Sequence, residues 1–251
     1  MTTIAYGSGP DEVGDLFRPD ASRAPLVCLF HGGFWRMPHG RDELTPIARD
    51  LAASGFVVWN LEYRRVGPGG HAWPATFQDI DALVAHLPRL AEAERQIDLT
   101  RLAFAGHSAG GHLAFWAAAS ALRHARAPRP RAVVGLAPIL DLVAADAAGV
   151  GNHAVAALLG GGRDDVPERY AGASPRALLP LGLRQYVIHG DADTAVPVQL
   201  SRDYAVAADE AGDDVTCIVL PGGDHMAFVD PSSQAHHATR RCLLDACGDA
   251  P

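Results

Sequence analysis

Six short apolar runs recur along the chain, and longer stretches with helical spacing of their apolar positions separate them. The runs are rich in β-branched or aromatic residues and cover 25–30, 55–63, 101–106, 131–137, 184–190 and 215–222. They are continuous rather than alternating, which is typical of strands covered on both faces. The helical stretches cover 41–54, 75–95, 109–126, 197–211 and 232–247. The pattern predicts an α/β protein with a mostly parallel, doubly wound sheet and helices on both faces.

Two segments depart from this rhythm. Near the N-terminus, IAYG at 4–7 and GDLFRP at 14–19 are expected to form a leading pair of antiparallel strands. From Asp141 to Pro175 the chain is rich in alanine and glycine, and we expect two helical fragments at most. Insertions of this size between strands are commonly functional. We therefore predict a single domain over 1–251 with a short lid-like insertion at about 141–175.

The composition fits one globular domain and limits its partners. The chain has 251 residues, of which 48% are apolar and 20% charged, and one α/β domain of this length is normal. Its formal net charge is −8 at pH 7, and an acidic surface repels phosphate backbones and anionic lipid. We therefore expect a small-molecule substrate and no nucleic-acid or membrane partner, whereas a homodimer stays open.

Targeting and redox signals favour the cytoplasm. The first residues show no basic segment followed by an apolar stretch, and no apolar run approaches the roughly 18 to 20 residues of a membrane span. The four cysteines, at positions 28, 217, 242 and 247, lack metal-like spacing and are expected to be reduced and structural. A cytoplasmic protein is the resulting prediction.

Several chemistries are disfavoured by what the chain lacks. All 21 basic residues are arginine, so a Schiff base, a serine–lysine dyad and a phosphate-loop lysine are excluded. The nearest approaches to a metal set, HH at 236–237 and DAD at 191–193, do not have ligand spacing. The glycine-rich runs at 67–70 and 160–162 lack the strand–glycine–helix context of a dinucleotide loop. We expect neither a metal nor a redox cofactor.

One serine stands between two glycines where an apolar run meets an alanine-rich helical stretch. In GHSAG at 106–110, Ser108 fits the G-x-S-x-G pattern of a nucleophile on a tight strand-to-helix turn. Its neighbours must be small because the turn is strained and the two elements approach closely. A serine in this place can instead cap the following helix. The preceding strand and following helix favour the nucleophile.

A nucleophilic serine needs a histidine base and a carboxylate that orients the base. Two loops downstream of Ser108 follow the last two predicted strands, and we expect both at the carboxyl edge of the sheet, where such sites form. His225 is the candidate base because it directly follows the last strand. Asp193 is the candidate acid and Asp191 the alternative, since Asp193 sits further into its loop. Asp224, next to the base, is expected to be solvated.

The segment HGGFW at 31–35 directly follows a predicted core strand. A tetrahedral intermediate needs backbone N–H donors, and consecutive glycines let the main chain approach closely. We assign the N–H groups of Gly33 and Phe34, together with that of Ala109, as candidate oxyanion donors. A plain tight turn is the alternative. His31 is expected to orient this loop by hydrogen bonding rather than to transfer a proton.

These motifs together resemble the α/β-hydrolases of the kynurenine formamidase and hormone-sensitive-lipase-like esterase group. The matching segments follow the family's order over most of the chain: HGGFW at 31–35, EYR at 62–64, WPATFQD at 73–79, GHSAGG at 106–111, HGDADTAVP at 189–197 and GGDHMAF at 222–228. In the family pattern H-G-x-x-D-x-x-V-P the triad acid is the fifth residue, which is Asp193 here. The form H-G-G-x-W resembles the formamidase branch more than the three-glycine form of lipase-like esterases.

The resemblance also implies roles for residues outside the motifs of the triad. It implies an α/β-hydrolase fold in which residues 62–79 support the oxyanion loop. Tyr63 and Arg64 would be a buried hydrogen-bonding scaffold, and Asp79 a partner at the start of a helix.

The implied reaction is hydrolysis through an acyl-enzyme. The resemblance indicates an aryl formamide such as N-formylkynurenine, or a small ester, as the substrate. A general carboxylesterase for short-chain esters is one alternative, and a non-catalytic hydrolase-fold binding protein is another. Trp35 is a candidate substrate contact, with Phe34 and parts of the insertion. Arg36 is expected to be solvated, and contact with an anionic substrate is the alternative.

Overall fold

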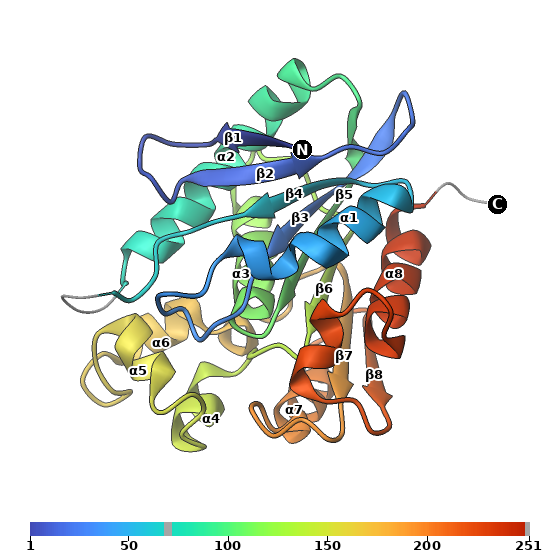
Figure 1. The fold of residues 1–251 in the computed structure, drawn as a ribbon. Helices are drawn as coiled ribbons and strands as arrows, with labels where there is room; N and C mark the ends of the chain where they lie inside the picture. The colour runs from blue at the N-terminus through green and yellow to red at the C-terminus, as the bar shows by residue number, and fades with distance from the viewer. Residues whose placement is uncertain (68–71, 249–251) are drawn as a thin grey trace.

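Eight strands form one mostly parallel sheet in the described part of the chain, residues 1–67 and 72–248 of a computed structural model (Figure 1). They are β1 (Thr2–Ala5), β2 (Val13–Phe17), β3 (Ala24–Phe30), β4 (Val57–Leu61), β5 (Ile97–His107), β6 (Ala132–Leu136), β7 (Arg184–Gly190) and β8 (Val215–Leu220). Their order across the sheet is β1-β2-β4-β3-β5-β6-β7-β8. Most of the glycine-rich run at 67–70 lies outside the described residues.

The strand directions confirm the predicted fold class. The β1–β2 and β2–β4 pairs are antiparallel, which matches the expected N-terminal pair, and every pair from β4 to β8 is parallel. All six predicted core strands are present. The third of them is longer than expected, because β5 begins at Ile97, where it pairs with Ala24 before a register shift at Pro25/Leu26.

Helices cover both faces of the sheet, as predicted. The helices α1 (Thr45–Ala53) and α8 (Gln234–Cys247) pack on one face, with Leu51 and Leu243 fully buried. The helices α2 (Ala75–Ala93), α3 (Ala109–Arg123) and α7 (Val198–Glu210) pack on the other, burying Leu83 and Leu113 (Figure 1). A short 3₁₀ turn, η1 (Arg41–Leu44), precedes α1. None of the helices in the described residues is both long and apolar enough to cross a membrane.

The insertion between β6 and β7 holds more helix than the sequence indicated. It contains α4 (Leu142–Ala147), α5 (Ala154–Leu159), α6 (Pro167–Ala173) and the 3₁₀ turn η2 (Pro175–Leu178), so the expectation of at most two helical fragments was wrong. Local signals explain part of the difference. The Asp141 carboxylate caps α4 by accepting the N–H groups of Val143 and Ala144, and Pro167 opens α6. The lid role of this segment stays a prediction.

The carboxyl ends of the central strands lie in register along one edge of the sheet. Phe30, the last residue of β3, lies opposite Gly106 of β5, and the last residues of β5 and β6, His107 and Leu136, lie opposite one another. The last residues of β7 and β8 are also opposite one another. Parallel strands release their loops at the same edge. The loops after β3, β5, β6, β7 and β8 therefore gather there.

Candidate active site

Ser108 lies on a sharp turn between β5 and α3. Its φ is 55° and its ψ −117°, and such a conformation costs a non-glycine residue about 1–3 kcal/mol. A Cβ on Gly106 would lie 2.1 Å from the carbonyl oxygen of Gly110, and one on Gly110 would lie 2.1 Å from that of Phe30. Both glycines are required because β5, α3 and the end of β3 come into contact at this turn.

The Ser108 hydroxyl is buried and unpaired. The residue is 1% exposed, and within the described residues its Oγ has no hydrogen-bond partner. Ser108 stands at the N-cap position of α3, yet its side chain makes no capping hydrogen bond. A buried polar group without a partner costs free energy and calls for an explanation, such as a catalytic role. The geometry gives no support to the helix-cap alternative.

The loops after β7 and β8 bring a carboxylate and an imidazole together. Asp193 Oδ2 lies 2.6 Å from His225 Nδ1. The carboxylate is fully buried, whereas the imidazole is 13% exposed. Asp191, the alternative acid, instead accepts the backbone N–H of Gly222 at 2.6 Å. Asp193 therefore contacts the candidate base, whereas Asp191 links the loop after β7 to the loop after β8.

The Asp193 carboxylate is surrounded by donors. Its Oδ1 accepts the backbone N–H groups of Ala195 and Val196, both at 2.8 Å. Its Oδ2 accepts a hydrogen bond from a second histidine, His189, whose Nε2 lies 3.1 Å away. Burial alone would raise the pKa of Asp193, but the hydrogen bonds from His189, His225 and Val196 hold that pKa far below its usual value. Asp193 therefore stays ionised beside the imidazole.

His225 is also held from the side of the serine turn. His107, the residue before Ser108, contacts the His225 ring at 4.6 Å between centroids. Its Nε2–H donates to the His225 carbonyl at 2.9 Å. Burial, together with the nearby His225, lowers the pKa of His107 to about 3, so that ring is neutral near neutral pH. Asp224 is exposed as expected, and its side chain caps the 3₁₀ turn η3 (His225–Val229).

The loop after β3 adopts a left-handed backbone over three consecutive residues. The φ angles are 98° at Gly33, 53° at Phe34 and 55° at Trp35. Within the described residues the N–H groups of Gly33 and Phe34 donate to no carbonyl or side chain. The Ala109 N–H belongs to the first turn of α3, where helix N–H groups lack partners. These three N–H groups are therefore free to donate to an oxyanion.

Trp35 anchors this loop in the interior. The side chain is fully buried, and its indole N–H donates to His112 Nδ1 at 3.2 Å. The other nitrogen of His112, on α3, faces the Ala173 carbonyl of α6 at 2.9 Å. Burial lowers the pKa of His112 to about 4, so the neutral ring can accept and donate at once. The complete burial of Trp35 does not support its predicted contact with substrate.

Arg36 joins the same loop to the insertion. Its guanidinium donates to the Gly151 carbonyl at 2.7 Å and to the Asn152 carbonyl at 3.0 Å. A Cβ on Gly151 would lie 2.3 Å from the Phe34 ring, so the two segments are in direct contact. The expectation that Arg36 is merely solvated was wrong, because backbone carbonyls far along the chain bind it.

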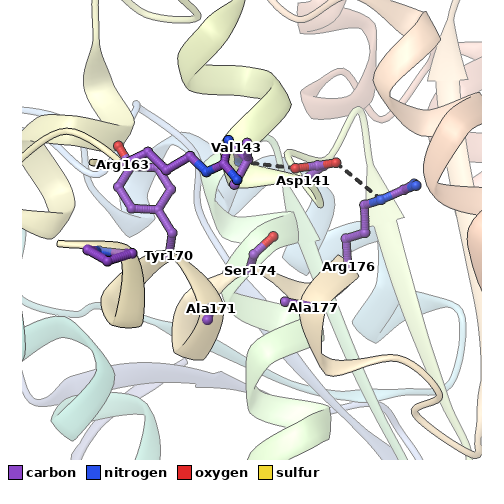
Figure 2. A pocket seen from close by; sticks show the side chains of 9 residues that line it. Asp141, Val143, Arg163, Tyr170, Ala171, Ser174, Arg176 and Ala177 are labelled. Carbon is purple, nitrogen blue, oxygen red and sulfur yellow. Dashed lines mark hydrogen bonds and ion pairs between the residues drawn. The ribbon is translucent and has the colours of Figure 1, made fainter. Parts of the chain in front are cut away.

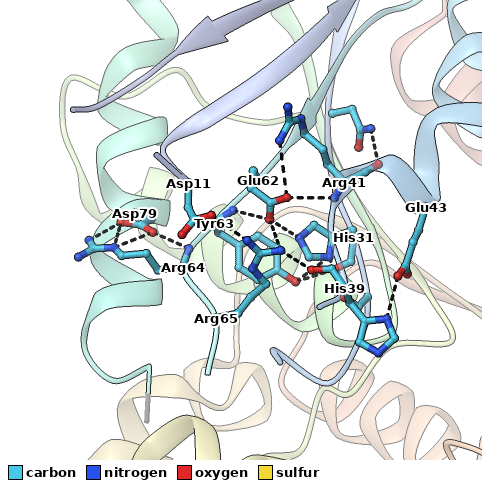
Figure 3. A network of polar contacts seen from close by, with 12 residues as sticks. Asp11, His31, His39, Arg41, Glu43, Glu62, Tyr63, Arg64, Arg65 and Asp79 are labelled. Atoms are coloured by element: carbon cyan, nitrogen blue, oxygen red, sulfur yellow. Dashed lines mark hydrogen bonds and ion pairs between the residues drawn. The ribbon is translucent and has the colours of Figure 1, made fainter. Parts of the chain in front are cut away.

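A network of polar residues lies behind the loop (Figure 3). Tyr63 is fully buried and donates its hydroxyl to the His31 carbonyl at 2.7 Å, as the predicted scaffold requires. Asp79, near the start of α2, accepts Arg64 Nε at 2.8 Å. Arg64 is not buried as expected, since 41% of its side chain is exposed and it reaches Asp79 from the surface.

A cavity of about 450 Å³ lies on the insertion between β6 and β7 (Figure 2). Asp141, Tyr170 and Arg176 are among the residues that line it, and Asp141 pairs with Arg176 at 3.3 Å. None of Ser108, Asp193 or His225 lines this cavity. We therefore do not assign it to the site at the sheet edge.

Similarity to known proteins assigns the chain to a family. The family model described as BD-FAE matches residues 15–207. This chain belongs to the BD-FAE family. The family is of the α/β-hydrolase type, and the resemblance to kynurenine formamidases and hormone-sensitive-lipase-like esterases is confirmed by relatives of both kinds.

Two relatives of this BD-FAE family member illustrate the two kinds. Kynurenine formamidase of Danio rerio is 32% identical over 118 residues, which cover 45% of this chain and 37% of that protein. Esterase LipC of Mycobacterium tuberculosis is 28% identical over 244 residues, which cover 88% of this chain and 58% of that protein. The chain thus spans less than two thirds of the length of each.

Solved structures support the fold of the BD-FAE chain. A truncated carbohydrate esterase from gut microbiota aligns with a TM-score of 0.83 at 22% identity, covering 98% of this chain and 96% of that one. An acetyl ester-xyloside bifunctional hydrolase from Caldicellulosiruptor lactoaceticus aligns with a TM-score of 0.78 at 22% identity, covering 100% and 97%. At this identity the likeness establishes the α/β-hydrolase fold alone.

Proposed function

We propose that this protein is a serine hydrolase that cleaves a small ester or an aryl formamide through an acyl-enzyme. The observation that carries the proposal is the 2.6 Å contact between Asp193 and His225 beside the Ser108 turn. The unpaired Ser108 hydroxyl and the free N–H groups of the neighbouring loop add the nucleophile and the oxyanion donors. A binding protein has no need of these groups together.

The mechanism follows from the orientation of the imidazole. Because Nδ1 of His225 faces Asp193, its Nε2 is the nitrogen available to Ser108. Ser108 Oγ attacks the carbonyl carbon while Nε2 takes the hydroxyl proton, and Asp193 stabilises the imidazolium. His225 then gives this proton to the departing alcohol or amine. Catalytic hydrogen bonds commonly tighten only in the substrate complex, which is consistent with the unpaired Oγ.

The oxyanion of the tetrahedral intermediate is assigned to three backbone donors. They are the N–H groups of Gly33, Phe34 and Ala109. Fixed donors of this kind stabilise developing charge without reorganising during the reaction. Water then attacks the acyl-enzyme while His225 takes a proton from the water molecule. His225 gives this proton to Ser108 Oγ as the acid product leaves. These steps use protein groups and water alone, so the proposal includes no metal or cofactor.

An aryl formamide and a short-chain ester are both candidate substrates. The formamidase relatives and the H-G-G-x-W form of the loop at 31–35 favour the formamide. A general carboxylesterase is the second candidate because esterases LipC and LipQ align over 88% of the chain. The net charge of −8 supports a small-molecule substrate rather than a nucleic acid or a membrane. A cytoplasmic location is part of the same proposal.

A fluorophosphonate probe tests the nucleophile. We expect the probe to label the protein at Ser108, with the adduct located by peptide mass spectrometry, and Ser108→Ala to abolish both labelling and turnover while the fold is retained. Ser232→Ala, at an exposed serine, is the matched control and is expected to label normally. Wild-type protein that neither reacts with the probe nor turns over any ester or formamide would favour a binding protein.

A substrate panel separates the two enzymes. N-formylkynurenine, 4-nitrophenyl acetate and 4-nitrophenyl butyrate are compared by kcat/KM, with Ser108→Ala as the blank. Preference for the formamide supports a formamidase. Preference for butyrate without formamide cleavage supports the carboxylesterase instead.

A further inference from the structure

His31 is the first residue of the loop at 31–35, which we call the oxyanion loop. Each nitrogen of its ring faces a hydrogen-bond acceptor, and Figure 3 shows the contact with Glu62. Its Nδ1 lies 2.7 Å from the Gly32 carbonyl oxygen, and its Nε2 lies 2.7 Å from Glu62 Oε1. The imidazole is fully buried. A carbonyl oxygen and a carboxylate oxygen only accept, so both contacts are hydrogen bonds only when both ring nitrogens carry a proton. The geometry is that of an imidazolium.

The alternative is a neutral imidazole that accepts a proton from a neutral Glu62. The other contacts of Glu62 argue against it. Its oxygens also accept the Tyr63 backbone N–H at 3.1 Å and the Arg41 backbone N–H at 3.2 Å, and Arg65 Nη1 lies 3.1 Å away. Burial would raise the pKa of Glu62, but the contacts with His31 and Arg65 hold it below its usual value. Glu62 is therefore an ionised carboxylate.

The charges around His31 balance only when it is protonated. Both nearby arginines contact Glu62, but each also pairs with a second acid at shorter range. Arg41 lies 2.9 Å from Asp15 and 3.7 Å from Glu62, and Arg65 lies 2.8 Å from Asp11 and 3.1 Å from Glu62. The cluster therefore contains three carboxylates, Asp11, Asp15 and Glu62, and three bases, Arg41, Arg65 and His31. The charges of the two arginines balance those of Asp11 and Asp15, so a protonated His31 is needed to balance the charge of Glu62. Uncompensated buried charge is costly, so the balance favours the protonated ring.

The remaining groups that face this cluster do not upset the balance. Tyr63 stacks on the His31 ring at 4.3 Å between centroids. Burial and the nearby Glu62 raise the pKa of Tyr63 well above its usual value, so its phenol is neutral. His39 offers its carbonyl to Arg65, while its ring faces the exposed Glu43. Arg64 pairs with the buried carboxylate of Asp79 and lies 3.9 Å from Glu12 on the outer side.

The Gly32 carbonyl belongs to the same peptide group as the Gly33 N–H, which is one of the assigned oxyanion donors. A cationic donor on the carbonyl oxygen draws electron density from the peptide and makes its N–H a stronger donor. We propose that His31, held as an imidazolium by Glu62, is a positioning residue that polarises the Gly32–Gly33 peptide toward the oxyanion. This inference rests on the proposed function, because it assumes the role of the Gly33 N–H.

Glu62→Gln is the decisive variant. A glutamine can keep one hydrogen bond to His31, but it removes the negative charge that retains the second proton. Loss of one whole oxyanion donor costs about 10²–10³-fold in kcat, and weakening one should cost less, so we expect kcat to fall about tenfold. KM should change less than about twofold, since the donor acts on the transition state. Glu43→Gln is the matched control, because His39 and Glu43 form an exposed pair at the same 2.7 Å distance.

The protonation state is measured separately by NMR with ¹⁵N-labelled histidine. In Ser108→Ala protein, which needs no activity, we expect two protonated ring nitrogens on His31 at the pH of the kinetic assay. Adding Glu62→Gln should leave one, and adding Glu43→Gln should leave two. Circular dichroism and thermal unfolding establish that each variant is folded.

The outcomes are distinct from those that test the proposed function. A single ring proton on His31 in the parent protein overturns the inference without a variant. Two ring protons in the parent protein also overturn it if folded Glu62→Gln loses one of them and keeps an unchanged kcat, because the charge would then not reach the oxyanion. Two ring protons retained in Glu62→Gln likewise overturn it, because Glu62 would then not hold the imidazolium. Full activity of Ser108→Ala instead refutes the proposed function, and the state of His31 is still measured.

Discussion

His225 Nδ1 lies 2.6 Å from Asp193 Oδ2, although the two residues are 32 positions apart in the chain. The contact depends on the loops that follow β7 and β8, which are parallel neighbours. These loops approach so closely that a Cβ on Gly190 would lie 2.0 Å from the Gly223 carbonyl oxygen. The contact between His225 and Asp193 therefore depends on the sheet edge and on two glycines, more than on any local sequence pattern.

The two aspartates of the β7 loop should differ sharply in their effect on catalysis. Asp193→Asn should lower kcat by about 10³–10⁴-fold, because an amide no longer holds the Nδ1–H tautomer of His225 or stabilises the imidazolium. Asp191→Asn should lower it less than about tenfold, since that carboxylate only accepts the Gly222 N–H. Steady-state kinetics on the best substrate of the panel gives both values. Equal losses in the two variants would contradict the assignment of the acid.

The bond between Trp35 and His112 should support the oxyanion loop. Trp35→Phe keeps a large ring but removes the indole N–H, so the strained backbone at Phe34 and Trp35 loses one restraint. We expect kcat to fall about three- to tenfold with a loss of about 1 kcal/mol in the free energy of unfolding. Trp116→Phe is the control, because its indole donates to Gly172 at 3.0 Å but lies outside the loop.

A double-mutant cycle identifies the partner. In a His112→Gln background, Trp35→Phe should have a smaller effect than in the wild-type protein, because the shared bond is already lost. Additive effects on kcat would show that Trp35 acts through other contacts.

His112 should also make stability depend on pH. In the unfolded chain its pKa is about 6.5, whereas burial lowers it to about 4 in the folded protein. As pH falls below 6.5, His112 takes up a proton in the unfolded state but stays neutral in the folded state. The part of the free energy of unfolding that His112 contributes above pH 6.5 is therefore lost progressively down to pH 4. We expect the wild-type protein to lose about 2 kcal/mol more than His112→Gln between pH 7 and pH 4.5. Urea unfolding at both pH values measures this, and parallel losses would refute it.

The sequence was sufficient to predict the six core strands and the turn at Ser108. Continuous apolar runs and the G-x-S-x-G spacing report local requirements, namely burial on two faces and close backbone approach at Gly106 and Gly110. His112 could also have been found. It stands four residues after Ser108 on a helix, where positions i and i+4 share a face.

Other features of the site have no local signal. Arg36 binds carbonyls 115 and 116 positions away, and a backbone carbonyl leaves no mark in the sequence. The side of the loop that faces the interior is likewise fixed by the fold, so the burial of Trp35 could not be predicted from HGGFW. The third helix of the insertion escaped prediction because short helices depend on packing more than on intrinsic propensity.

Arg36 should act as a restraint on the insertion. The segment 149–153 has positive φ at Gly149, Gly151, Asn152 and His153, and left-handed backbone of this kind persists only where the surroundings hold it. Arg36 provides two of those contacts, from the side of the oxyanion loop. Arg36→Lys keeps the charge, but a single ammonium cannot reproduce the fork that reaches both carbonyls. We expect faster amide hydrogen exchange across 149–153 and, if the insertion closes over the substrate, a rise of about fivefold in KM.

Arg163→Lys supplies the comparison, since Arg163 lies in the same insertion but is exposed and, among the described residues, its side chain forms no hydrogen bond or ion pair with 149–153. Its exchange and its KM should match the wild-type values. Faster exchange in Arg36→Lys with an unchanged KM would leave Arg36 as a restraint on the loop but remove the insertion from substrate binding. Unchanged exchange would show that the Phe34–Gly151 contact alone is enough to hold the two segments together.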